Sequence, residues 1–243
     1  MSESAGMGKA VLITSTGLGV GKSFITTGLA VLLRERGLDV GVMKPIEIGW
    51  PAEAGEWPAD AEQLRDAAGS DDPLEDICPY IYEEFIAPQL AADHARRPIE
   101  LDVIKASLKR LRKRHDIVLI EGVGGLAVPI DDGIDLATMA AECGASVLIV
   151  TCAHVGTLNT TFLTVHYARS RKLEVLGAIA NRLDMTLEDP TVPTNAKMIQ
   201  RMCDIPVFGV VPFSPEADGI EGVAEVCRSN IDIDQFMKAA GLG

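Results

Sequence analysis

A glycine-rich segment that ends in a lysine and a serine offers the clearest chemistry in this sequence. Residues 15–23 read STGLGVGKS and directly follow an apolar run. Glycines let several backbone N–H groups converge on phosphate oxygens, while Lys22 supplies a cation and Ser23 a hydroxyl ligand for Mg²⁺. Thr16 replaces the first glycine of the strict GxxxxGK[ST] pattern, but an apolar run before the segment and a helical pattern after it are the context this motif requires. We therefore predict a phosphate-binding loop, or P-loop.

Two charged residues end later apolar runs and could complete such a site. Lys44 ends the run 40–44, and Glu121 ends the run 117–121. The carboxyl ends of parallel strands border the ligand crevice, so we expect both side chains to face the phosphates. An acidic residue opposite a P-loop is the expected Mg²⁺ partner, directly or through water, and Asp60 could supply a further oxygen. A surface lysine at position 44 and a solvated carboxylate at position 60 remain open alternatives.

The elements that must position these residues follow from six short runs rich in Val, Ile and Leu. Their hydrophobicity is continuous rather than alternating, which is typical of parallel strands covered on both faces. We predict an α/β fold: one doubly wound, mostly parallel sheet with helices on both faces, spanning residues 8–243, after a flexible N-terminal tail of residues 1–7. The runs are Ala10–Thr14, Val40–Lys44, Ile117–Glu121, Ser146–Val150, Leu176–Asn181 and Val207–Val211.

Helices are expected between these runs, where apolar residues recur at helical spacing. The segment from Gly49 to Pro88 differs, since it holds five prolines and several acidic residues. We expect it to cross the carboxyl edge of the sheet with one short helix over 61–68, because long loops in α/β domains usually carry function. The apolar sets that predict two of the helices are Ile25, Leu29, Leu32 and Leu33, and Val103, Leu108 and Leu111.

Composition excludes several classes of protein. Of 243 residues, 47% are hydrophobic and 23% charged, which excludes wholesale disorder. Lys plus Arg number 22 against 35 Asp plus Glu, giving 22 − 35 = −13, a net charge that repels nucleic acid and anionic membranes. No apolar run approaches the 18 residues that span a bilayer. We expect a cytoplasmic protein with neither nucleic acid nor membrane as partner, whose five widely spaced cysteines are reduced packing residues.

The order and spacing of several motifs resemble the ATP-dependent dethiobiotin synthetase family. The resemblance runs from about Val11 to about Ser214; its later motifs are weak one by one but specific as an ordered set. These motifs are Lys22-Ser23, Lys44-Pro45, Asp60-Ala61, Pro79-Tyr80 with Glu84 and Pro88, Glu121 to Gly125, Gly156 to Asn159, and Ala180-Asn181.

The resemblance implies a reaction and its participants. It implies an ATP-dependent cyclo-ligase of biotin biosynthesis that carboxylates 7,8-diaminononanoate with CO2. The γ-phosphate of ATP then activates the carbamate, and closure of the ureido ring yields dethiobiotin, ADP and phosphate. It also implies Mg²⁺ as cofactor and a homodimer with active sites near the subunit interface.

The resemblance also assigns roles to individual residues of this sequence. Lys44 and Lys22 are implied to be catalytic, with Lys44 holding the substrate carbamate, and Ser23, Asp60 and Glu121 are implied to hold magnesium. Asn181 matches the adenine-reading residue. The implied nucleotide-binding residues are Gly17, Leu18, Gly19, Val20, Gly21, Lys22, Ser23, Phe24, Asp60, Glu121, Gly122, Val123, Gly124, Asn181, Arg182, Pro212, Phe213 and Ser214, and those for the substrate, whose carboxylate the start of a helix would hold, are Lys44, Gly156, Thr157, Leu158 and Asn159.

Three positions depart from the family pattern. Ile48 stands where a small hydroxyl residue is usual and cannot donate a hydrogen bond to the carbamate. The EPxxPH motif reads Glu84-Phe85-Ile86-Ala87-Pro88-Gln89, without its histidine, and Leu18 stands where threonine is common. None of these positions belongs to the magnesium or phosphate chemistry, so they bear on the identity of the diamine.

Three other functions remain to be weighed. A homologous MgATP-dependent ligase could act on a different amine or carboxylate. A partition-type ATPase switch would carry a second lysine early in its P-loop, as KGGxGK[ST], but Gly17 holds that position. The basic run from Lys109 to Arg114 suggests nucleic acid, since eight of the 22 basic residues lie between Arg96 and Arg114. At a helix end, such a run is more typical of a solvated face with cations at the C-terminus.

Overall fold

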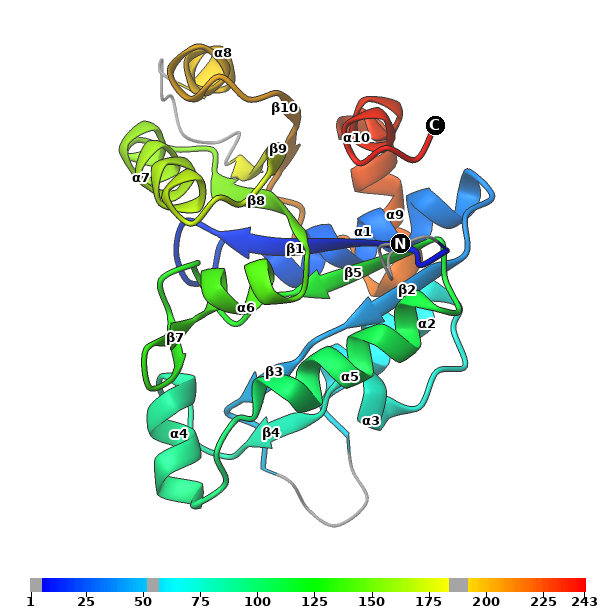
Figure 1. Cartoon of the computed structure of the whole chain (residues 1–243). Helices are drawn as coiled ribbons and strands as arrows, with labels where there is room; N and C mark the ends of the chain where they lie inside the picture. The colour runs from blue at the N-terminus through cyan, green and yellow to red at the C-terminus, as the bar shows by residue number, and fades with distance from the viewer. Residues whose placement is uncertain (1–5, 52–56, 184–191) are drawn as a thin grey trace.

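A six-stranded parallel sheet forms the centre of the protein (Figure 1), seen in a computed structural model that describes residues 6–51, 57–183 and 192–243 and leaves out the side chains of residues 182, 183, 192 and 193. Each of the six apolar runs forms one strand, so the predicted fold class is confirmed. The strands are β1 (Lys9–Ser15), β2 (Val40–Met43), β5 (Ile117–Glu121), β8 (Ser146–Cys152), β9 (Val175–Leu183) and β10 (Val207–Pro212), in the order β10-β9-β8-β1-β5-β2.

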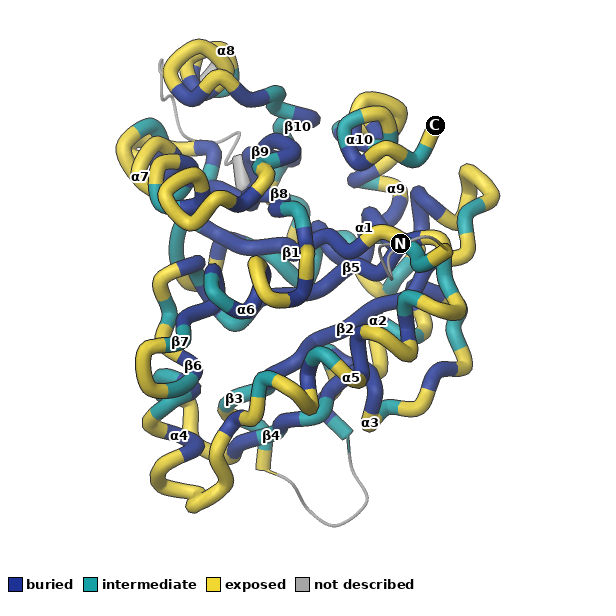
Figure 2. Tube along the Cα trace, viewed as in Figure 1, coloured by how far each residue is buried: buried dark blue, intermediate teal, exposed yellow. Residues whose placement is uncertain are grey.

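Helices cover both faces of the sheet and enclose two separate cores. Successive side chains of a strand point to opposite faces, so Val11 and Ile13 belong to one core and Ala10 and Leu12 to the other. The strands are buried except for the edge strand β10, which is only partly buried, and the helices keep their outer sides exposed (Figure 2). Side chains of α1 (Lys22–Glu35), α2 (Ala59–Ala68), α3 (Leu74–Ile77), α9 (Gly219–Asn230) and α10 (Ile233–Ala239) join the first core, and those of α4 (Pro88–Ala95), α5 (Leu101–Arg112), α6 (Leu136–Glu142), α7 (Thr157–Ser170) and α8 (Val192–Cys203) join the second.

The predicted helices α1 and α5 both form, with one error of face. In α5 the buried apolar residues are Ile104, Leu108 and Leu111, which recur at the spacing of one helical stripe. Val103 lies one residue, or about 100°, from that stripe and is 39% exposed. The helix forms as predicted, but Val103 does not belong to its buried stripe.

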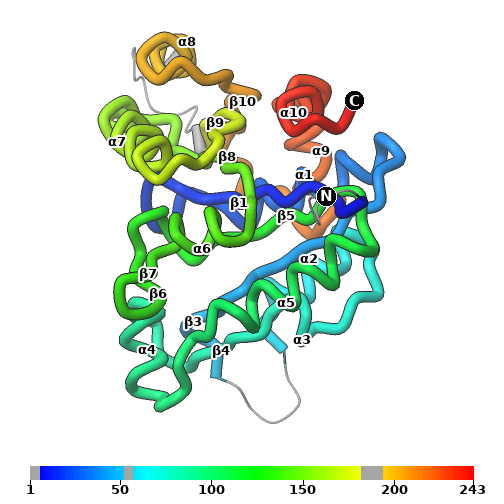
Figure 3. The backbone as a smooth tube through the Cα atoms, in the orientation of Figure 1, coloured from blue at the N-terminus to red at the C-terminus, as the bar shows by residue number. Residues whose placement is uncertain are grey.

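The segment from Gly49 to Pro88 has more regular structure than the sequence predicted. Its expected helix is α2, but α3 and the strand β4 (Tyr80–Tyr82) follow, and β4 pairs in parallel with β3 (Ile46–Ile48). In Figure 3 the chain continues from β2 into β3. The elements α2, α3 and β4 then follow beside the β2 edge of the central sheet. A second small sheet joins β6 (Pro129–Asp131) to β7 (Ile134–Asp135) in antiparallel pairing.

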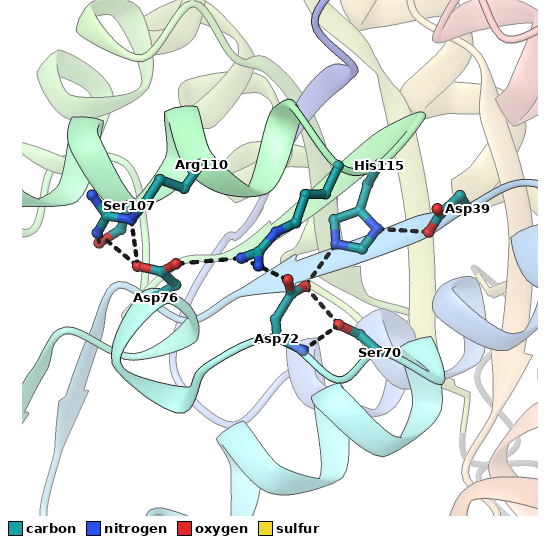
Figure 4. Close-up of polar contacts among 8 residues, drawn as sticks. Asp39, Ser70, Asp72, Asp76, Ser107, Arg110 and His115 are labelled. Carbon is teal, nitrogen blue, oxygen red and sulfur yellow. Dashed lines mark hydrogen bonds and ion pairs between the residues drawn. The ribbon is translucent and has the colours of Figure 1, made fainter.

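The basic run at the end of α5 serves the fold rather than forming a purely solvated face. Arg110 Nε donates to Asp76 Oδ1 at 2.8 Å, and an Arg114 Nη2–Asp72 Oδ1 ion pair measures 2.7 Å (Figure 4). Arg112 Nε donates to the carbonyl of Gly8 at 2.7 Å. Arg110 and Arg114 thus remain exposed, as the solvated reading expected, but they also pair with carboxylates in and just before α3. Arg112 instead anchors the residue before β1.

His115 extends the same network between two carboxylates. Its Nδ1 lies 2.6 Å from Asp39 Oδ1 and its Nε2 lies 2.6 Å from Asp72 Oδ2, while Ser70 Oγ also donates to Asp72 (Figure 4). Asp72 is only 2% exposed. A buried carboxylate thus joins the residues after α2 to the residues before β5.

The cysteines and the membrane-spanning potential of the helices are the last two features that the sequence analysis addressed. Four of the cysteines are buried and Cys152 is partly so, and none of the five forms a disulfide, as expected of packing residues. Across residues 6–51, 57–183 and 192–243, no helix is both long and apolar enough to cross a membrane.

Replacing Asp72 with asparagine should lower the free energy of unfolding by about 2 kcal/mol or more, because Arg114 and His115 lose a buried anionic partner. Urea unfolding followed by circular dichroism measures this. Asp234→Asn is the matched control, since Asp234 pairs with Arg36 at an exposed site, and it should change stability little. Equal small effects of both variants would contradict a structural role for the network.

Candidate active site

The P-loop is held by contacts from β1, from β9 and from the loop after β5. It connects β1 to α1, and the residue before the helix, Gly21, has φ 85°, a left-handed conformation that favours glycine. Ser15 Oγ lies within hydrogen-bond distance of the carbonyl of Gly17 (2.7 Å) and of Gly124 (3.2 Å) in the loop after β5. From the other side, Asn181 Nδ2 donates to the carbonyl of Val20 at 2.8 Å. The loop is thus fixed before any ligand binds.

A small pocket lies on the β9–β10 side of this loop. Its volume is about 100 Å³, and Asn181 in its wall is buried. The structure brings together six residues that are separated by up to 193 positions in the sequence (214 − 21). One of them, Phe213, is half exposed. Arg182 lies in β9, and its side chain is outside the described part of the structure. The lining residues are Gly21, Phe24, Asn181, Pro212, Phe213 and Ser214.

One carboxylate oxygen joins the P-loop helix to Lys44. Ser23 Oγ donates to Glu121 Oε1 at 2.8 Å, and Lys44 Nζ lies 3.3 Å from the same oxygen. Glu121 is only 2% exposed, and its Oε2 is buried without a hydrogen-bond partner among the described residues. The structure therefore places three predicted site residues from three elements within direct contact.

Lys44 is surrounded by carboxylates. Besides Glu121, it pairs with Asp60 and lies 2.8 Å from Glu47 Oε2. Burial by itself would lower the pKa of Lys44, but the three carboxylates outweigh burial and raise it above its ordinary value. Lys44 is therefore a fixed cation at neutral pH.

Glu47 was missed by the sequence analysis. Burial raises its pKa, although Lys44 opposes this by stabilising the charged form. The sequence offers one signal for Glu47: it is a single acidic residue between two isoleucines, in a short strand-like run that directly follows Lys44-Pro45.

Lys22 contacts a residue at the start of its own loop. Its Nζ donates to Ser15 Oγ at 3.3 Å. Burial lowers the pKa of Lys22, while Glu121 and Asp60 raise it and Lys44 adds to the lowering. A buried ammonium whose contact is a neutral hydroxyl would gain strongly from an anion, and phosphate oxygens are the anions that a P-loop presents to its lysine.

The oxygen donors fit a magnesium ion held mainly by nucleotide. The hydroxyl of Ser23 and the carboxylates of Glu121 and Asp60 are hard oxygen ligands, and Glu121 Oε2 is an unsatisfied buried acceptor. In the ranges that the structure describes, no group of three His, Cys, Asp or Glu forms a metal cage. Mg²⁺ usually takes one or two carboxylates together with phosphates and waters, so this sparse set suits it.

Threonines connect the P-loop to the start of α7. Thr16 Oγ1 lies 3.0 Å from Thr151 Oγ1, which lies 2.8 Å from Thr157 Oγ1. Gly156, with φ 95°, precedes the first turn, which holds Thr157, Leu158 and Asn159 as expected. The sequence analysis missed Thr151, although it stands near the carboxyl end of β8, where ligand crevices form.

Known sequences resemble this chain over most of its length. A family model described as an AAA domain matches residues 9–221. The ATP-dependent dethiobiotin synthetase BioD of Anaeromyxobacter dehalogenans strain 2CP-C is 38% identical over 86% of this chain and 92% of its own length. The protein of the same name from Bacillus licheniformis is 32% identical over 97% of this chain and 98% of its own length.

Solved structures share the fold. The cell division ATPase MinD of Pyrococcus furiosus has a TM-score of 0.60 and 19% identity, covering 97% of this chain and 98% of its own. The septum site-determining protein MinD of Pyrococcus horikoshii OT3, complexed with Mg-ADP, has a TM-score of 0.58 and 20% identity over 96% and 95%. At these identities the likeness concerns the architecture alone.

Replacing Lys44 with methionine should lower the free energy of unfolding in metal-free buffer by about 3 kcal/mol at pH 8, because three carboxylates lose their buried cation. The loss should be smaller at pH 5. Without Lys44 the pKa of the buried Glu47 carboxyl rises further, because the cation that opposes the effect of burial is gone. The stability of the variant therefore falls as pH increases above about 4.5, whereas Lys44 stabilises the native protein throughout the range below its ordinary pKa.

Chemical denaturation at both pH values measures the difference between the two proteins. Lys105→Met removes an exposed lysine that pairs with Asp102 and Glu142, and this control should show no such pH dependence. A loss for Lys44→Met that is equal at pH 5 and pH 8 would contradict the electrostatic account.

Proposed function

The chain belongs to the ATP-dependent dethiobiotin synthetase family, and from this premise we propose which of its residues perform the reaction. The protein is an ATP-dependent ligase of biotin biosynthesis. The observation that carries the proposal is the shared contact of Ser23 and Lys44 with Glu121, which links the P-loop to a buried ammonium.

The reaction proceeds in three bond-forming steps and needs no protein nucleophile. One amine of 7,8-diaminononanoate attacks CO2 and loses a proton, which gives a carbamate. A carbamate oxygen then attacks the γ-phosphorus of ATP and ADP leaves. The second amine attacks the activated carbonyl, phosphate leaves, and the ureido ring of dethiobiotin closes. The protein must hold two anions together while charge develops, which is a task of positioning and electrostatics.

Lys44 is assigned to the carbamate and the terminal phosphoryl group. Its raised pKa, due to its carboxylate neighbours, keeps the ammonium charged, and burial strengthens its attraction for an anion. Asp60 is the most exposed of its three partners, so we expect that contact to be exchanged first when the anions arrive. Lys44, which neutralises carboxylates before the substrates bind, would then neutralise the charge that develops during the reaction.

The P-loop and two flanking sites bind the rest of the substrates. Residues 17–24 are assigned to the triphosphate, with Lys22 contacting its oxygens. The pocket that contains Asn181 and Phe213 is assigned to adenine, since an aromatic ring and a buried amide suit a planar polar base. The first turn of α7, from Gly156 to Asn159, is assigned to the substrate carboxylate because helix N-termini favour anions.

Magnesium would be held by Ser23, Asp60 and Glu121. When bound, the ion would neutralise phosphate charge and orient the terminal phosphoryl group. The buried free oxygen of Glu121 supports this assignment.

We further propose that the enzyme acts as a homodimer in the cytoplasm. Phe162 and Leu163 on α7 leave 43% and 56% of their surface exposed, which would suit contact with a second copy. Five cysteines that form no disulfide suit a reducing compartment.

The function is tested with the purified protein, MgATP, bicarbonate and 7,8-diaminononanoate. We expect dethiobiotin and phosphate in equal amounts, and a fall in turnover of at least about 100-fold in Lys44→Ala with little change in ATP affinity. Lys105→Ala is the control and should keep full turnover. Phosphate release that ignores the diamine would favour another ligase activity, and full turnover by Lys44→Ala would remove its role.

Glu121→Gln tests the metal assignment without relying on turnover. Calorimetry should find ATP binding to the native protein tightened by Mg²⁺ and that gain reduced about 10- to 100-fold in the variant, because a charged oxygen ligand is lost. Glu142→Gln, at an exposed site on α6, should keep the gain. An undiminished magnesium effect in Glu121→Gln would contradict the assignment.

A further inference from the structure

An apolar cavity of about 390 Å³ lies beside the P-loop, and most of the residues that line it have no role in the assignments above. Its walls come from four separate segments: the P-loop, β3, the residues that lead into α4, and the residues from the end of β5 to β6. Every lining residue is apolar or a glycine, so the walls offer no side chain that forms hydrogen bonds. The residues that matter most are Leu18, Ile48, Phe85, Val123 and Val128.

The rim of this cavity holds the two most exposed large hydrophobic side chains in the described part of the protein. Leu18 is 75% exposed and Phe85 is 74% exposed. Apolar side chains that gather in an exposed hollow mark a binding site more often than scattered ones do. A hydrocarbon ligand here would remove both from water, at a gain proportional to the apolar area covered.

The ring of Phe85 is seated rather than loosely exposed. It lies on Gly49, where φ is 79° and where a Cβ atom would come within 2.8 Å of the ring atom Cδ2. Only glycine therefore allows the ring to occupy this position without displacement. The backbone after β3 is thus built to receive the aromatic wall of the cavity.

The cavity borders the phosphate-binding loop and the strand that follows Lys44. Ile48, in its wall, follows Glu47, whose carboxylate lies 2.8 Å from Lys44 Nζ. Gly17, also in the wall, is the first residue assigned to the triphosphate. A molecule whose reacting group meets Lys44 and the P-loop could therefore extend a neighbouring hydrocarbon group into the cavity.

The wall also contains one residue from each of the three motifs in which the sequence departs from its family's pattern, although Gln89, which replaces the motif's histidine, is not among the lining residues. Leu18, Ile48 and Phe85 lie in separate segments, yet they line one space. Two of these positions lose a hydroxyl and the third gains a large ring. The changes therefore act together, replacing hydrogen-bonding groups with apolar surface at one place.

Resting on the proposed function, we propose that Leu18, Ile48 and Phe85 are specificity-determining residues that hold the hydrocarbon of the acceptor next to its reacting amines. The acceptor class is a vicinal diamine with alkyl substituents, selected by apolar area rather than by hydrogen bonds to the walls. Diamines with longer alkyl groups should accordingly be better acceptors than short ones.

The test uses three diamines without a carboxylate: 2,3-diaminobutane, 2,3-diaminohexane and 2,3-diaminooctane. With MgATP and bicarbonate, diamine-dependent phosphate release should show kcat/KM rising about two- to fourfold per added methylene, the upper value being that for full burial. Leu18→Thr, Ile48→Thr and Phe85→Ala should each flatten this rise. Val103→Thr changes an exposed apolar residue on α5, outside the cavity, and should leave the rise intact.

Calorimetric binding of the same diamines separates this proposal from the proposed function. Turnover of 7,8-diaminononanoate with a flat diamine series, unchanged in the three variants, would overturn the specificity proposal and leave the function standing. If 7,8-diaminononanoate is not turned over, the proposed function fails. Even then, a binding affinity for the diamines that rises with chain length, and that is lost in the variants, would support the specificity proposal. An affinity that does not change with chain length would overturn the specificity proposal. Light scattering adds one more outcome: variants that dissociate a dimer but keep the chain-length dependence would identify an interface between copies and overturn the proposal.

Discussion

A single buried oxygen atom, Glu121 Oε1, is the contact on which the site depends. It accepts a hydrogen bond from Ser23 on the P-loop helix and lies 3.3 Å from the ammonium of Lys44. A buried carboxylate is costly unless it is paired, and a buried ammonium equally so. Each group therefore requires the other, and together they fix the distance between the phosphate loop and the cation that we assign to the terminal phosphoryl group.

The sheet makes this contact possible through its register. Ile13 of β1 lies opposite Glu121, and Met43 of β2 lies opposite Ile120, so Lys44 follows β2 beside the last residue of β5. Parallel strands end at one edge, and the two cores on either face hold that edge rigid. Asn181 from β9 supports the same loop from the other side. The site is thus assembled by three strand ends rather than by a mobile loop.

Much of the fold and part of the site could be predicted from local patterns. All six central strands are continuous apolar runs, and Lys44 and Glu121 were found because polar residues at strand ends point to the crevice. Glu47 and the β3–β4 pair could not be found, because parallel pairing over more than 30 residues leaves no local period. The partners of Arg110 and Arg114 were missed for the same reason: the carboxylates of Asp76 and Asp72 reach them only through the tertiary fold.

The cavity that we assign to the hydrocarbon of the substrate differs in chemistry from the region that we assign to the phosphates. Charges and fixed dipoles surround Lys44, whereas the neighbouring cavity with Ile48 and Phe85 offers only apolar surface. The most direct measurement of the central claim is a crystal structure with a non-hydrolysable ATP analogue, Mg²⁺ and the diamine. The account predicts Lys44 Nζ within hydrogen-bond distance of a terminal phosphate oxygen while Ser23 and Glu121 flank the metal. A terminal phosphate held by the P-loop with Lys44 still bound only to its three carboxylates would contradict it.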